Sequence, residues 1–167
     1  MPLKNPKDLF LVLLSDARQS AERTTKTMQE VGQIAQDLQV KEAVEESAAT
    51  GNQIIARLDQ CFALIGEKPM KLTGKLHDIT VEEIRKEAAD IQAPLVRQLW
   101  VLSKAIQLIH LRVSEYIALI AAADITGNHV VRELLEANLA DKVAAVEKAR
   151  RLIRNIVETK IKERSAA

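Results

Sequence analysis

The sequence predicts an all-α protein, a bundle of four long helices, and three observations support this fold class. Apolar residues make up 47% of the 167 residues and recur at steps of three and four along four segments, as one face of a helix requires. Aromatic residues make up only 2%, so the core must consist of Leu, Ile, Val and Ala, which suit close helix packing. The five Gly and four Pro are too few for the many turns of a sandwich or barrel.

The first helix is predicted to begin at Pro6 and to end near Asp37. Asn5 can cap the free amide groups, Pro6 suits the first helical position, and Asp8 favours the positive end of the helix dipole. After a very short connection, the second helix is predicted to run from about Val40 to Gly66, a residue type that commonly ends helices.

A long connection with a short helix of its own is predicted next. From Glu67 to Ile79 the periodicity breaks, with Pro69 and Gly74 as turn residues. Thr80 to Glu83 then matches a capping box, which predicts a short helix from Val81 to about Ile91.

The third long helix is predicted to begin at Pro94 and to end at Gly127, and Asn128 can cap the fourth. In the third helix, Leu108, Leu111 and Leu119 add apolar residues outside the main face, so this helix is expected to be the most enclosed or to face a second subunit. The main face itself consists of Leu95, Leu99, Leu102, Ala105, Ile106, Ile109, Val113, Tyr116, Ile117 and Ile120.

The connection lengths predict the topology. Short connections make antiparallel hairpins of the first two and the last two long helices, and one long crossover with a short extra helix joins the hairpins. Among bundles this is the ferritin-like arrangement, here in a single domain that covers residues 1–167.

Composition also bounds function. A formal net charge of +1 gives no electrostatic reason to expect nucleic acid or a membrane as a partner. The single cysteine, Cys61, excludes an internal disulfide and is expected to be a small apolar core residue. The N-terminal apolar run is too short for a signal peptide, so a cytoplasmic location is expected.

Stretches of all four helices carry a family resemblance. They are Leu9-Phe10, Leu13-Leu14-Ser15-Asp16 and Ser20-Ala21-Glu22, then Ile55 to Phe62, the segment around His110 and Tyr116, and Leu134-Leu135. In these stretches the sequence resembles the YciE/YciF family of bacterial stress-associated proteins, which have a ferritin-like, rubrerythrin-related fold.

The resemblance implies a metal site that this sequence has largely lost. A ferritin-like di-iron site needs inward carboxylates from all four helices. Carried over by position, the family's ligands leave Glu22 on the first helix and Asp141 on the fourth as remnant metal ligands. The other ligand positions fall at Ala49, Thr50, Gln53 or Ile54, Ile109, Arg112, Ala140 and Lys142.

Arg112 suggests what replaced the metal. Because it falls at a ligand position, its guanidinium is expected to be buried and to pair with Glu22 or Asp141. His77, His110 and His129 form no metal-binding pair, and His110 is expected to be a packing or interface residue.

The sequence therefore leaves two functions open. The first is a structural or interaction protein, more a binding module than an enzyme, with no cofactor, which acts through association as a homodimer or with another protein partner. The alternative is a di-iron or di-manganese oxidoreductase or iron-handling protein that keeps Glu22 and Asp141 and uses further ligands.

Overall fold

The computed structural model describes residues 3–166, apart from the side chains of residues 75–77. All regular secondary structure in this range is helical, which confirms the all-α prediction. The helices are α1 (Pro6–Ile34), α2 (Leu38–Ile65), α3 (Lys75–Ala89), α4 (Pro94–Ile125) and α5 (His129–Ser165).

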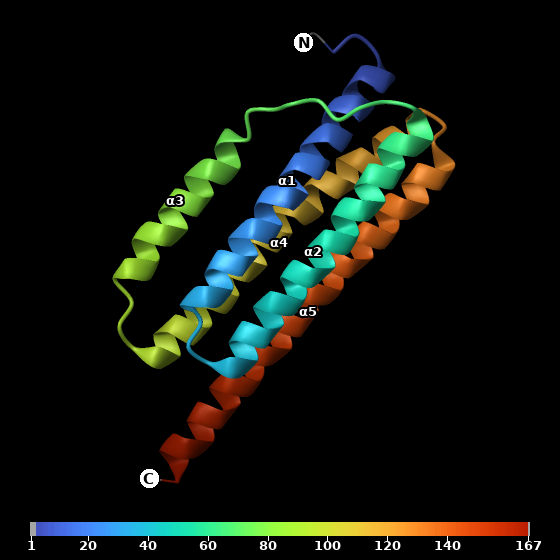
Figure 1. The fold of residues 1–167 in the computed structure, drawn as a ribbon. Coiled ribbons are helices and arrows are strands. Elements are labelled where there is room, and N and C mark those ends of the chain that lie inside the picture. Colours follow the sequence, from blue (N-terminus) through green and yellow to red (C-terminus); the bar gives the residue numbers. More distant parts are fainter. Residues whose placement is uncertain (1–2, 167) are drawn as a thin grey trace.

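The four long helices form two hairpins, α1 with α2 and α4 with α5 (Figure 1). The hairpins pack so that α1 lies on α4 and α2 lies on α5. Helix α3 belongs to the long crossover between α2 and α4, and it contacts α1 on the outside of the bundle. The predicted topology of two hairpins with one crossover is the one observed.

The capping chemistry of the first hairpin follows the sequence. The Asn5 side chain accepts a hydrogen bond of 2.9 Å from the Asp8 amide, and Gly66 ends α2 with a positive φ of 68°. The first helix ends at Ile34 rather than near Asp37, because the Asp37 carboxylate caps the next helix and accepts from the Val40 amide at 3.1 Å. Asn128 does precede α5, but its side chain donates to the Thr126 hydroxyl instead of capping.

The capping box predicted at Thr80 was wrong. Helix α3 already begins at Lys75, after Gly74, so Thr80 lies inside the helix. The cause is tertiary: the Arg23 guanidinium on α1 donates to the Gly74 carbonyl at 2.9 Å and pairs with the Asp78 carboxylate at 3.0 Å. These contacts anchor the start of α3 one and a half turns earlier than the local signal indicates.

The predicted face of α4 needs a correction. Leu108 and Leu119 are 1% and 0% exposed, whereas Ile117, which was assigned to the core, is 64% exposed. Because α4 packs against both α1 and α5, its buried surface is rotated toward Leu108 and Leu119. By length and composition alone α4 could also span a membrane, a property that core helices of soluble bundles share.

Helix α5 extends past the other helices at its C-terminal end (Figure 1). Its last fully buried residue is Ala149, and every described residue from Val157 onward is exposed.

Candidate functional site

The candidate site lies midway along the bundle, where α1, α2, α4 and α5 converge. In most of the interior the buried side chains are apolar, but at this level several polar or charged side chains are buried. Burying such groups is costly unless they find partners, so their arrangement is informative. The side chains concerned are Thr24 and Thr25 of α1, Arg112 and Tyr116 of α4, and Asn138 and Lys142 of α5.

Arg112 is buried, with 3% of the residue exposed, but its partner differs from the expected one. Its guanidinium donates to the Glu115 carboxylate at 2.5 Å, and within residues 3–166 it forms no ion pair with Glu22 or Asp141. Residues three apart on one helix face each other, so Glu115 reaches Arg112 without leaving α4. The predicted pairing of Arg112 with Glu22 or Asp141 is therefore corrected to Glu115.

Burial acts strongly on this pair. Desolvation raises the pKa of the Glu115 carboxyl above its usual value, and the neighbouring Arg112 charge opposes that rise. Within the described residues, the Nε of Arg112 and the second carboxylate oxygen of Glu115 are buried and have no hydrogen-bond partner.

Glu22 lies outside this interior. Its side chain is 50% exposed and forms ion pairs with Arg18 and Lys26 on the same helix, both at 3.3 Å. Hydrogen bonding to Lys26 lowers the pKa of Glu22. The structure thus places the predicted remnant ligand Glu22 on the surface and does not bring it to Asp141.

Asp141 is held by a cation from α2. Its carboxylate forms a close ion pair with the Arg57 guanidinium, which also donates to the Asn138 amide oxygen at 3.1 Å. The Asn138 amide in turn donates to the Tyr116 hydroxyl at 3.4 Å. This chain of contacts ties α2, α5 and α4 together, and burial raises the pKa of Tyr116.

Lys142 is the most isolated charge of the site. It is 8% exposed, and its ammonium lies 5.5 Å from the centre of the Tyr116 ring. Burial, and then the positive charge of Arg112, lower the pKa of Lys142 to about 8. Because Asp141 pairs with Arg57 and Glu115 with Arg112, neither carboxylate forms an ion pair with Lys142 within residues 3–166.

This donor set does not fit a ferritin-like di-iron centre. Within the described part of the chain, no three His, Cys, Asp or Glu side chains are grouped so that they could hold a metal ion. The two carboxylates that act on Lys142, Glu115 and Asp141, are each engaged by an arginine, and Lys142 adds a further buried positive charge. Two divalent cations would meet cations here rather than bridging carboxylates.

The remaining sequence candidates lie away from this cluster or are chemically inert. Cys61 is fully buried, and desolvation raises the pKa of its thiol to about 11, as expected of a packing residue rather than a nucleophile. His110 is exposed on α4 and His129 is exposed at the start of α5. His77 falls outside the residues whose side chains are described.

A family model described as a domain of unknown function, DUF892, matches residues 5–162. The chain belongs to the DUF892 family. This finding agrees with the resemblance to the YciE/YciF proteins that the sequence indicates. No curated protein sequence matches this DUF892 member.

Solved structures similar to this DUF892 protein share its fold. The E. coli stress protein YciF is 20% identical with a TM-score of 0.88, and the match covers 93% of this chain and 99% of YciF. YcfI of Rhodopseudomonas palustris, described as a candidate structural protein, is 24% identical with a TM-score of 0.83, over 88% and 94% of the two chains. A protein of Xanthomonas campestris is 17% identical with a TM-score of 0.74, over 96% and 99%.

Several residues of this site, among them Asn138, Lys142, Arg57 and Glu115, were not recognised as site residues in the sequence analysis. Asn138 carried a signal, because it is a polar residue at a position of the apolar face of its helix. Lys142 fell at a family ligand position next to Asp141. Together with Arg112 at another ligand position, it could have indicated that two positive charges are buried in the bundle. Arg57 and Glu115 gave no signal, because their roles depend on neighbours that the fold supplies.

Proposed function

We propose that this DUF892 protein is a ferritin-like structural or interaction protein that has lost its redox metal and acts through association. One observation carries the proposal: Arg112 and Lys142, two cations, are buried at the level where a ferritin-like site needs carboxylates. The positive charge of these side chains stabilises neighbouring carboxylates without a bound metal ion. The alternative, a di-iron or di-manganese protein, would require ligands from outside this cluster.

The structural relatives suggest the context. YciF is called a stress protein and YcfI a candidate structural protein, and both names concern those proteins. By analogy we infer a stress-associated role without catalysis for this chain. Because function is carried by sites rather than by the fold, the physical tests concern metal content and association.

The first test measures metal. Protein purified without chelator and reloaded anaerobically with ferrous iron should hold far less than one tightly bound iron per chain, because the buried cations repel it. Mass spectrometry after desalting gives the stoichiometry. The Asp141→Asn variant should bind the same trace amount. About two irons per chain, the content of a di-iron bundle, would instead establish the alternative function.

The proposed association surface is an apolar stripe on the outer side of α4. Its residues recur every three or four positions, and Ile117, in its middle, is 64% exposed. Ile106, Val113 and Ile120 are half-buried against the core, and His110, the polar member of the stripe, is exposed. A stripe of this kind on a single helix is self-complementary when two copies pack antiparallel about a two-fold axis. The stripe consists of Ile106, His110, Val113, Ile117 and Ile120.

The second test measures oligomeric state. We expect a homodimer at micromolar concentration, and Ile117→Glu should convert it to a monomer because a carboxylate would be buried at the interface. Light scattering coupled to size exclusion measures the mass. Ile161→Glu is the matched control, since Ile161 is 58% exposed on α5, away from the stripe. A wild-type monomer, or a dimer unaffected by Ile117→Glu, would refute the assigned surface.

A further inference from the structure

Two adjoining cavities lie beside the buried polar side chains of the candidate site. The first has a volume of about 170 Å³ and lies between α2, α4 and α5. The second has about 30 Å³ and extends toward α1. Ser47, Thr50, Ile109, Asp141 and Ala145 line both cavities, so the two adjoin; together they are called the hollow, with the first as its outer and the second as its inner part.

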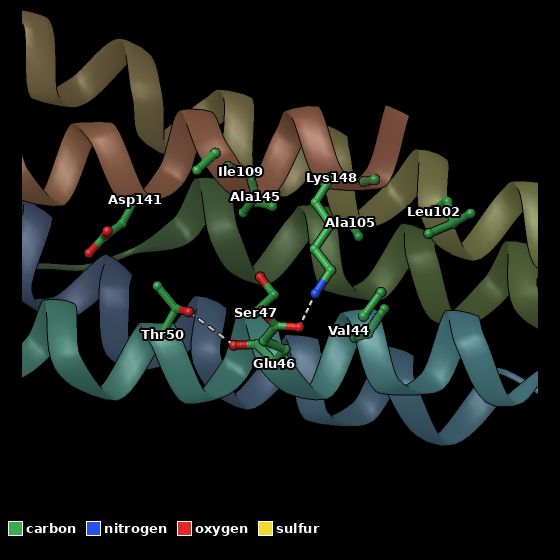
Figure 2. Close-up of a pocket in the computed structure, with 13 residues that line it drawn as sticks. Val44, Glu46, Ser47, Thr50, Leu102, Ala105, Ile109, Asp141, Ala145 and Lys148 are labelled. Carbon is green, nitrogen blue, oxygen red and sulfur yellow. Dashed lines mark hydrogen bonds and ion pairs between the residues drawn. The ribbon is translucent and has the colours of Figure 1, made fainter. Parts of the chain in front are cut away.

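The outer part is mostly apolar and has a defined mouth. Figure 2 shows Val44 and Leu102 at one end of this cavity and Thr50 and Asp141 at the other. Many of its other wall residues are alanines, which leave the space unfilled. At the mouth, the Lys148 ammonium of α5 forms a close ion pair with the Glu46 carboxylate of α2.

The inner part is lined by hydrogen-bonding groups. Thr24 and Thr25 of α1 are both 7% exposed, and the buried Thr24 hydroxyl has no hydrogen-bond partner in the part of the chain that the structure describes. Lys142 forms part of the same wall and has no carboxylate partner among the described residues. Thr24 and Lys142 thus line the same cavity. A buried hydroxyl without a hydrogen bond and a buried lysine without an ion-pair partner are both costly, and an acceptor group bound in this cavity would offer a partner to each.

We propose that this hollow binds a small monocarboxylate, with the apolar chain or ring in the outer part and the carboxylate against Thr24, Thr25 and Lys142 in the inner part. The outer volume suits the apolar portion, since a closed apolar cavity of about 150 Å³ accepts a benzene-sized molecule. A carboxylate only accepts hydrogen bonds, and it matches walls that offer hydroxyl donors and an ammonium.

The charge of Asp141 does not oppose this assignment. Its carboxylate also lines the hollow, but the Arg57 guanidinium is bound directly to it and offsets its charge. A cationic ligand would have to displace Arg57 and approach Lys142, whereas an anionic one gains an ion pair with Lys142. An uncharged ligand of the same shape would fill the outer part and leave Lys142 unpaired.

The test compares three probes with one chain length: hexanoate, hexanol and hexylamine. Binding to the full-length protein is measured by calorimetry and by chemical shifts of the Ala145 methyl group. Hexanoate should bind saturably and about tenfold or more tighter than hexanol, the factor that one hydrogen bond to a charged group supplies. Hexylamine should bind weakest. No saturable hexanoate binding, or hexanol binding as tightly as hexanoate, would overturn the proposal.

Two variants locate the site. Ala145→Leu places a larger side chain where both parts meet and should abolish binding, while Ala140→Leu, the same change at an exposed position of α5, should leave it unchanged. Lys142→Met keeps the shape and should reduce the preference for hexanoate over hexanol to near unity. If Ala145→Leu does not fold, the Lys142→Met result decides alone. An unchanged preference in that variant would refute the role of Lys142.

Discussion

Lys142→Met is expected to stabilise the protein by roughly 1–3 kcal/mol at neutral pH, a rare direction for a point substitution. The Lys142 residue is 8% exposed, and among the described residues its ammonium forms no ion pair and lies 5.5 Å from the centre of the Tyr116 ring. Methionine has a similar length, no charge and a flexible chain that adapts to irregular space. Urea unfolding followed by circular dichroism measures the gain.

The pH dependence of this gain follows from the pKa of Lys142, which burial and Arg112 lower from 10.5 to about 8 in the folded state. Below about pH 8 the folded protein must hold the charge, so the full cost is present. Between about pH 8 and 10.5 the folded protein releases a proton that the unfolded chain keeps, so wild-type stability rises with pH. Arg112, Glu115 and Asp141 are the charged groups that act on Lys142.

The stability difference between Lys142→Met and wild type should therefore narrow above pH 8. Lys148→Met, at an exposed lysine two turns along α5, is the control, and it should change stability little at either pH. A destabilised Lys142→Met variant would mean that Lys142 is compensated by its carboxylate neighbours and is not an isolated charge.

Gly51→Ala is expected to destabilise the protein by roughly 1–3 kcal/mol, although alanine is the better helix former. Gly51 lies in the middle of α2, and a Cβ atom there would come within 2.2 Å of the Thr25 hydroxyl oxygen of α1. It would also approach the Thr25 Cβ and Cγ2 atoms to 3.2 and 3.3 Å, so rotating the Thr25 side chain cannot relieve the contact. Thermal unfolding measures the loss.

The double variant Gly51→Ala with Thr25→Ala gives the matched control. Removing the Thr25 hydroxyl and methyl groups should restore much of the lost stability, so the two substitutions should be strongly non-additive. Gly32→Ala, where the nearest atom lies at an ordinary 3.5 Å, should be tolerated. Additive effects of the two substitutions would show that Gly51 matters for a reason other than close helix approach.

The sequence predicted helix ends correctly where the end depends on the residue's own backbone and capping properties. Asn5, Pro6, Gly66 and Pro94 mark helix ends through their own backbone and capping properties, and all four lie where they were expected. The capping box at Thr80 failed because contacts from α1 start that helix earlier.

The site was harder to predict because its pairs depend on which helix faces which. The resemblance put Arg112 at an interior position, and Arg112 is buried. Its partner could not be predicted, because Glu115 on the same helix and carboxylates on other helices were all candidates, and only the fold decides between them. Glu22 was assigned inward by resemblance, yet its position on α1 faces solvent.

The overhanging end of α5 has a separate consequence. Past the bundle, its last turns have no core to pack against, and an unsupported helix of a few turns is only marginally stable in water. These turns remain helical because they extend a helix whose earlier turns are packed in the bundle. They are thus the place where a protease would cut first, and a cut beyond Val157 would leave every buried residue of the bundle in place.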